Sequence, residues 1–194
     1  MRHREKLRGQ AGFSLIELIV VMTIILVVSA IAVPSLINTV ADVRLRSSAS
    51  TLQGQLQLLR MRAVNDNKPY KLKMTTQAGT LMAYLDLDAG DDYDSAEPAV
   101  GLAKDVTVAT SGNPSMPNTT LNTTGWINPA TTATNLWFNA RGLPCDGVGA
   151  CNSPKGYIYY LSQSRNMGTT AWAAVSVTPA GRIRVWRWTG SVWR

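Results

Sequence analysis

The strongest constraint on this chain is an almost continuous apolar segment near its N-terminus. Residues 15–33 contain a single ionisable side chain, Glu17. About 20 apolar residues in a helix span the roughly 30 Å hydrocarbon core of a bilayer. Four Lys or Arg side chains precede the segment within the first eight residues, and such a basic flank stays in the cytoplasm. The segment is therefore predicted to cross a membrane and to place the rest of the chain on the outer side.

Two simpler interpretations of this segment remain open on the residues alone. A cleaved secretory signal peptide is supported by Ala30-Ile31-Ala32, a small-residue pattern after an apolar core. A plain membrane anchor explains the apolar residues but not Glu17, because a carboxylate at the centre of a membrane helix costs about 2.5–3.5 kcal/mol. The position of Glu17 near the end of the segment lowers that cost, which keeps the anchor interpretation open.

A third interpretation takes residues 12–17, which read GFSLIE, as one motif together with Pro34. In these positions the chain resembles type IV prepilins. The resemblance implies a basic leader that prepilin peptidase removes by cutting after Gly12, and N-methylation of the new terminal residue, Phe13. It also implies that Glu17 and Pro34 serve filament assembly. Pro34 lacks a backbone donor and is expected to interrupt the helix.

The expected role of Glu17 follows from the cost of an unpaired charge in lipid. An ionised carboxylate there seeks a cation, and the amine of a processed Phe13 is the nearest candidate. In the pilins that the motif resembles, this amine belongs to a neighbouring subunit. The pairing would make assembly selective, because a correctly placed neighbour relieves the unpaired charge.

After Pro34 the apolar pattern becomes that of an amphipathic helix. Apolar side chains recur at spacings of 4, 3, 4, 3 and 4 residues: Leu45, Ala49, Leu52, Leu56, Leu59 and Ala63. The predicted organisation is a leader at 1–12, a helix at 13–64 and a periplasmic β-rich domain at 65–194. Residues 13–33 form the transmembrane and assembly part of the helix, and residues 34–64 form its amphipathic part.

Short β-type segments follow Pro69, so the predicted fold class is α+β: one long N-terminal helix packed on a mainly antiparallel sheet, a pilin-like fold. The predicted strands are 70–74, 80–86, 106–109, 136–139, 157–162, 172–178 and 182–188. Residues 110–135 are rich in Thr, Asn, Pro and Gly, and are predicted to form a long surface loop.

The two cysteines of the chain, Cys145 and Cys151, are separated by a short glycine-containing segment. We predict a disulfide between them, which would stabilise the domain by about 2 kcal/mol and requires an oxidising compartment such as the periplasm. This location agrees with the predicted membrane orientation.

Later motifs narrow the resemblance to the GspH/FimT class of minor pilins and type II secretion pseudopilins. A strand leads into an acidic turn that ends in Glu97-Pro98, residues 138–144 fit Phe-x-x-x-Gly-x-Pro, and residues 181–184 read GRIR. The resemblance implies a subunit of a type II secretion pseudopilus or of a type IV pilus. It also implies, as an alternative, a FimT-like subunit that binds DNA through residues 181–184 during natural transformation.

The acidic turn is a candidate cation site. It contains six carboxylates, Asp86, Asp88, Asp91, Asp92, Asp94 and Glu97. Carboxylate oxygens suit Ca²⁺, and the weak candidate ligands are Asp86, Asp88, Asp92 and Asp94. The spacing is not that of an EF-hand, however, and acidic turns are commonly only solvated. No cofactor is therefore expected, and Ca²⁺ is the one candidate.

The last predicted strand carries the residues for the DNA-binding alternative. With a period of two, one face of the strand presents Arg182, Arg184, Trp186 and Trp188, and the other face presents Arg187. Arginines contact phosphate oxygens and indoles stack on bases. In the competing interpretation, the tryptophans pack under a loop or a neighbouring subunit and the arginines are solvated edge-strand charges.

Catalysis is not expected, because the only histidine, His3, lies in the leader and no nucleophile motif is present. The predicted partners are other pilin or pseudopilin subunits, prepilin peptidase, inner-membrane lipid and, in the alternative, DNA. The predicted location is the bacterial inner membrane, with a single span and a periplasmic C-terminal domain, and then a filament that reaches the periplasm or the cell surface.

Overall fold

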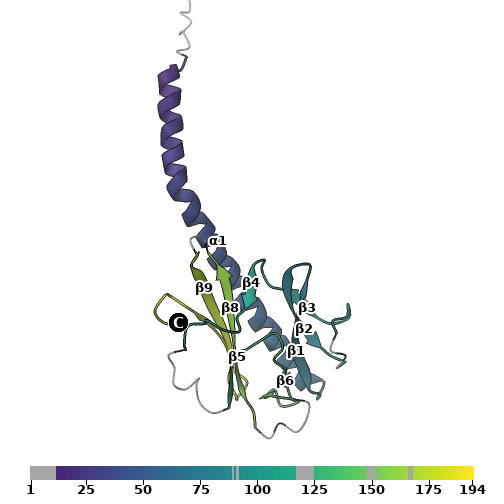
Figure 1. Ribbon diagram of the computed structural model, residues 1–194. Coiled ribbons are helices and arrows are strands. Elements are labelled where there is room, and N and C mark those ends of the chain that lie inside the picture. The colour runs from purple at the N-terminus through teal and green to yellow at the C-terminus, as the bar shows by residue number, and fades with distance from the viewer. Residues whose placement is uncertain are drawn as a thin grey trace, which may run out of the picture. The chain divides into compact units, whose positions relative to one another are not determined.

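The computed structural model describes residues 12–88, 90, 92–116, 125–147, 151, 153–165 and 168–194. The chain divides into two compact units, Met1–Ile37 and Asn38–Arg194. One helix, α1 (Leu15–Asn65), contributes its first residues to one unit and its remaining residues to the other (Figure 1). Residues 38–64 of the amphipathic part thus belong to the β-rich unit.

Helix α1 continues through Pro34, which corrects the expectation that this proline interrupts it. Pro34 has no N–H, so the carbonyl of Ala30, one turn earlier, lacks its usual amide donor. The helix absorbs this loss without separating into two elements. Asn65 is its last residue, and Asn67 follows with a positive φ of 51°.

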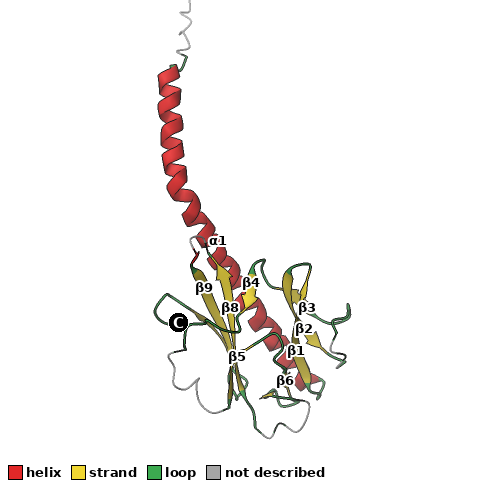
Figure 2. Cartoon of the chain, in the orientation of Figure 1, coloured by secondary structure: helices red, strands yellow, loops and turns green. Residues whose placement is uncertain are grey.

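The second unit contains two sheets beside the helix (Figure 2). The first sheet has the order β3-β2-β1-β6-β7 and is antiparallel throughout. Its strands are β1 (Tyr70–Gln77), β2 (Thr80–Asp86), β3 (Ala99–Gly101), β6 (Leu136–Phe138) and β7 (Pro144–Cys145). The second sheet has the order β10-β9-β8-β4, also antiparallel, and β5 pairs with β8 in parallel. Its strands are β4 (Val106–Val108), β5 (Trp126–Ala130), β8 (Gly156–Ser164), β9 (Thr170–Val177) and β10 (Ile183–Arg187).

The predicted apolar stripe of the helix is confirmed, because all six of its residues are buried. They share one hydrophobic core with residues of both sheets, including Leu72 and Leu85 of the first and Tyr159 and Val175 of the second. Each fully buried leucine contributes about 1.5–3 kcal/mol. The core therefore holds α1 and the two sheets together, and the predicted α+β class is confirmed.

One prediction about the sheets is wrong: residues 110–135 are not only a loop. They include β5, which pairs in parallel with β8 and has a register irregularity between Ile127 and Ala130. A short strand that pairs in parallel and has an irregular register shows no clear alternation of polar and apolar residues. A search for period-two alternation therefore does not detect β5. Strands β3 and β7 lie outside the predicted strands, and β7 has only two residues, the first of which is a proline.

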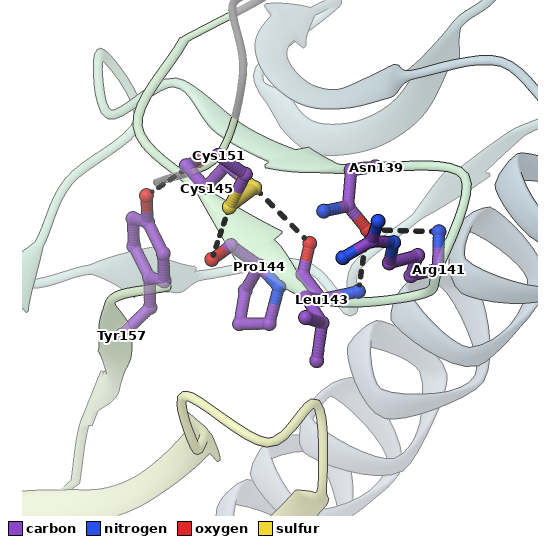
Figure 3. The surroundings of a disulfide bond; sticks show 7 residues. All are labelled: Asn139, Arg141, Leu143, Pro144, Cys145, Cys151 and Tyr157. Atoms are coloured by element: carbon purple, nitrogen blue, oxygen red, sulfur yellow. Dashed lines mark hydrogen bonds between the residues drawn. A yellow bond between two sulfur atoms is a disulfide. The ribbon is translucent and has the colours of Figure 1, made fainter. Parts of the chain in front are cut away.

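The Phe-x-x-x-Gly-x-Pro motif forms a tight turn after β6 (Figure 3). The Asn139 side chain accepts hydrogen bonds from the amides of Arg141 (2.9 Å) and Leu143 (3.0 Å). Gly142 has a φ of 72°, which favours glycine. Gly181 lies against this turn, where an added Cβ would stand 2.5 Å from the Gly142 carbonyl oxygen. The glycine of the GRIR segment therefore allows two turns to approach closely.

Beside this turn, Cys145 and Cys151 form a disulfide with their Cα atoms 5.6 Å apart (Figure 3). The buried hydroxyl of Tyr157 donates a hydrogen bond of 2.7 Å to the Cys145 carbonyl. Burial raises the pKa of Tyr157 well above its ordinary value, so the hydroxyl remains a donor at neutral pH. The disulfide thus closes a short ring that is fixed to the centre of the second sheet.

Candidate functional site

Gly12 and Phe13 precede the first helical residue, Leu15, in non-helical backbone. Phe13 is 83% exposed, and nothing lies within 4 Å of the position of a Cβ on Gly12. A peptidase could therefore reach the peptide bond between the two residues. The rest of the predicted leader, residues 1–11, lies outside the described residues.

Glu17 is the acidic residue in the first turn of α1. The amide of Leu18 donates to the Ser14 carbonyl at 3.1 Å, which makes Ser14 the N-cap residue and Glu17 the third helical residue. This Ser-x-x-Glu spacing is that of a capping box, and a carboxylate here also interacts favourably with the helix dipole. The Glu17 side chain itself is exposed.

The helix surface that follows is apolar and uncovered. Leu15 to Val33 include no buried residue, and the most apolar window of α1 has a mean hydropathy of 2.9. This helix is long and apolar enough to cross a membrane. An isolated water-soluble helix of this composition would expose far more contiguous apolar surface than monomeric soluble proteins show.

The basic strand β10 forms one edge of the second sheet, beside β9. Arg182, Arg184 and Arg187 are exposed. The Arg184 guanidinium lies 4.0 Å from the centre of the Trp186 ring, a cation–π contact. The charged groups of the predicted DNA-binding face are accordingly accessible.

The tryptophans that follow in the predicted strand, Trp186 and Trp188, are half-buried and make contacts within the protein, as the competing interpretation expects. The Trp186 indole donates to the Ser176 hydroxyl at 2.8 Å. Trp188 lies 5.3 Å, between ring centres, from the buried Trp193 near the C-terminus. These side chains belong to a small apolar cluster on the second sheet that also includes Tyr160. Packing under the C-terminal segment therefore accounts for the indoles.

The acidic turn after β2 is organised by internal contacts. Asp86, Asp88 and Glu97 bring carboxylate oxygens within 4.8 Å of one another, whereas Asp92 and Asp94 are not in this group. Asp86 is buried and pairs with Lys71 at 2.9 Å. Glu97 accepts hydrogen bonds from the amides of Leu87 (3.1 Å) and Asp94 (3.3 Å). Of the four candidate ligands, only Asp86 and Asp88 come together, and the charge of Asp86 is already compensated by Lys71.

The N-terminal features define a class of protein. Residues 7–33 match the family model described as the prokaryotic N-terminal methylation motif. With a Gly-Phe junction, an acidic residue in the first helical turn and an exposed apolar helix, this N-terminal region is similar to that of type IV pilin-like proteins.

Within this class the chain is similar to Type II secretion system protein H of Pseudomonas aeruginosa, with 38% identity over 78 residues. The match covers 40% of this chain and 45% of that protein, so it spans less than half of the relative's length. A solved structure of the minor pseudopilin EpsH from the type 2 secretion system of Vibrio cholerae aligns over 76% of this chain and 99% of that chain. The identity is 14% and the TM-score 0.42, and a second EpsH structure gives 15% and 0.39 over 75% and 94%.

Proposed function

We propose that this chain is a non-enzymatic minor pilin-like subunit of an inner-membrane-anchored filament machine. The single observation that carries the proposal is the placement of Glu17 in the first turn of an exposed apolar helix, directly after a Gly-Phe junction, within a match to the N-terminal methylation motif. The machine is a type II secretion pseudopilus or a type IV pilus, and the similarity to a type II secretion system protein H agrees with the former.

In this proposal residues 1–12 are a leader that prepilin peptidase removes, and Phe13 is then N-methylated. Residues 13–64 are the helix that anchors and assembles the subunit, and residues 65–194 form the periplasmic domain. The disulfide between Cys145 and Cys151 supports an oxidising location for that domain. The expected partners are lipid, the peptidase and other pilin or pseudopilin subunits.

Assembly chemistry would centre on Glu17 and Pro34. In the membrane, the Glu17 carboxylate lacks a fixed cationic partner, and the free amine at Phe13 of a neighbour would supply one as the two helices come into register. Pro34 removes one backbone hydrogen bond of the helix, the one to the carbonyl of Ala30. The helix can therefore bend locally at this point when it packs against its neighbours.

Mass spectrometry of the membrane-extracted native chain tests this proposal. We expect an N-terminus at Phe13 that carries one added methyl group, because Gly12 and Phe13 stand at the motif's junction. Gly12→Leu should leave the chain uncut. Ala32→Leu, which removes the small-residue signal of a secretory cleavage site, should leave processing at Phe13 unchanged. Native chains that begin at Met1 or after Ala32 would contradict the proposed function.

A second candidate function is DNA binding by the edge strand. It is favoured by the exposure of Arg182 and Arg184, whose guanidinium groups could contact phosphate oxygens. Base stacking by Trp186 has less support, since its ring already contacts Arg184 and its N–H is bonded to Ser176. This candidate therefore predicts binding through the phosphate backbone, with little sequence preference.

A gel-shift series over salt concentration with residues 38–194 distinguishes this candidate. Arg182→Gln/Arg184→Gln should weaken binding and reduce the salt slope by about 0.9 for each lost phosphate contact. Arg44→Gln/Arg141→Gln removes the same charge from two other exposed arginines and serves as the control. Equal DNA retention by the wild type and the strand variant at every salt concentration would exclude binding through β10.

A further inference from the structure

A pocket formed by α1, β9, β10 and the residue that follows β8 gathers charged side chains from distant parts of the sequence. Its charged lining residues are Asp42, Arg46, Arg165 and Arg187. Asp42 and Arg46 are one helical turn apart on α1, so they share one face of the helix. Arg187 ends β10 and Arg165 comes directly after β8. The fold thus collects three guanidinium groups around one carboxylate.

The charges of this pocket do not cancel. Arg165 donates to Asp42 through Nε, at 3.0 Å, and through Nη2. Arg46 and Arg187 are exposed, and no acidic side chain in the described ranges forms an ion pair with either of them. Asp42 therefore compensates one arginine, and the other two leave the pocket with an excess of positive charge that suits an anion.

The walls of the pocket and its place in the sequence indicate which anion. Trp172 and Trp188 line it, and both are half-buried. Asp42 follows Val33, the end of the apolar segment, by only nine residues. Exposed apolar side chains continue into the same turns of α1, at Val40 (41% exposed) and Val43 (60% exposed). Tryptophan beside arginine, next to an apolar surface, is the composition of a membrane–water interface.

We infer that the exposed arginines at the mouth of this pocket bind the phosphate of an anionic phospholipid headgroup in the outer leaflet of the membrane that the subunit occupies. Arg46 and Arg187 would bind the phosphate oxygens, Trp172 and Trp188 would lie at the level of the headgroups, and Asp42 would hold Arg165 in place. The inference rests on the proposed function, because it requires the apolar helix to be inserted. Release of this headgroup would accompany extraction of the subunit into a filament.

Native mass spectrometry of the full chain in detergent, titrated with phosphatidylglycerol or phosphatidylcholine of equal acyl length, tests the inference. The wild type should retain phosphatidylglycerol in preference to phosphatidylcholine. Arg46→Gln/Arg187→Gln should reduce this preference about 30-fold, since each basic group near an anionic headgroup changes affinity about fivefold. Both side chains are exposed, so the substitutions should not disturb folding.

Arg141→Gln/Arg182→Gln is the matched control. Arg182 directly precedes β10, whereas Arg187 is its last residue. Arg141 adjoins Gly142, whose carbonyl accepts a hydrogen bond from Arg60 near the C-terminal end of α1. This control should keep the preference, and loss in both variants would show an effect of net charge alone, contrary to a site.

Three other outcomes would overturn the inference. The first is equal retention of the two lipids by the wild type. This result would contradict a headgroup site without contradicting insertion of the helix in the membrane. The second is displacement of phosphatidylglycerol by an equal concentration of inorganic phosphate, which would assign the pocket to a free anion. The third is a subunit complex that Arg46→Gln/Arg187→Gln abolishes while lipid preference persists, which would assign it to a neighbouring chain. Retention of neither lipid would instead count against membrane insertion, and so against the proposed function itself.

Discussion

Glu17→Val is expected to leave the chain in the membrane and to reduce its incorporation into assembled filaments about 100-fold or more. In the proposed filament, loss of this carboxylate would leave the neighbour's terminal amine without a partner in an apolar environment. Breaking such a buried pair costs about 3–5 kcal/mol, and each 1.4 kcal/mol is a factor of ten. The measurement is the amount of the chain that co-purifies with filaments, relative to the amount in the membrane fraction.

Two variants separate assembly from helix capping. Ser14→Ala removes the N-cap but leaves the carboxylate, so it should cost the helix about 1 kcal/mol and still permit incorporation. Glu17→Asp keeps the charge and should retain most of the incorporation. The mature N-terminus of every variant should be determined, because a defect in cleavage would mimic a defect in assembly. Normal incorporation of Glu17→Val, or an equal loss in Ser14→Ala, would contradict the assigned role.

Periodic segments of this chain were predictable from the sequence because one physical pattern dominates each of them. The stripe from Leu45 to Ala63 follows the helical repeat and is buried throughout. Strand β2 has the predicted bounds, Thr80–Asp86, since it is rich in apolar residues and ends at an acidic turn. In both segments, local propensity and tertiary packing favour the same structure.

Contacts between distant segments were not predictable in the same way. Asp42 and Arg165 are 123 residues apart, and neither stands in a motif. The burial of the tryptophan at the end of the predicted strand, Trp188, depends on Trp193 near the C-terminus. Trp193 forms an isolated β-bridge with Trp188, and the two rings are in contact. Period-two analysis assigns side chains to a face of a strand but does not show whether another segment covers that face.

The pairing of Lys71 with Asp86 lies between these two cases, because a local signal for it exists. Strands β1 and β2 are joined by Ala78 and Gly79, both with positive φ, as in a two-residue hairpin turn. Such a turn fixes the register, and counting back from it places Lys71 opposite Asp86. The acidic composition of residues 86–97 alone predicts a solvated or cation-binding turn and does not reveal this cross-strand partner.

Lys71→Met is expected to destabilise the β-rich unit by about 3–5 kcal/mol, because it leaves the Asp86 carboxylate buried without its cation. The two side chains are 6% and 0% exposed, and their charged atoms are 2.9 Å apart. The lysine also lies 5.1 Å from the centre of the Trp137 ring, a contact that methionine keeps only in part. Urea unfolding of residues 38–194, followed by tryptophan fluorescence, measures the change.

The matched control is the exposed pair of Lys155 and Asp146, which are 2.7 Å apart but 37% and 46% exposed. Lys155→Met should cost no more than about 1 kcal/mol, since water already solvates both charges. Lys71→Met/Asp86→Leu should recover most of the stability lost in Lys71→Met, because replacing both members of a buried pair by apolar groups leaves no unpaired charge. Equal losses of stability in Lys71→Met and Lys155→Met would show that the buried Asp86 carboxylate does not need the lysine as a counter-charge. A double variant as unstable as Lys71→Met would show that the loss comes from packing and not from charge.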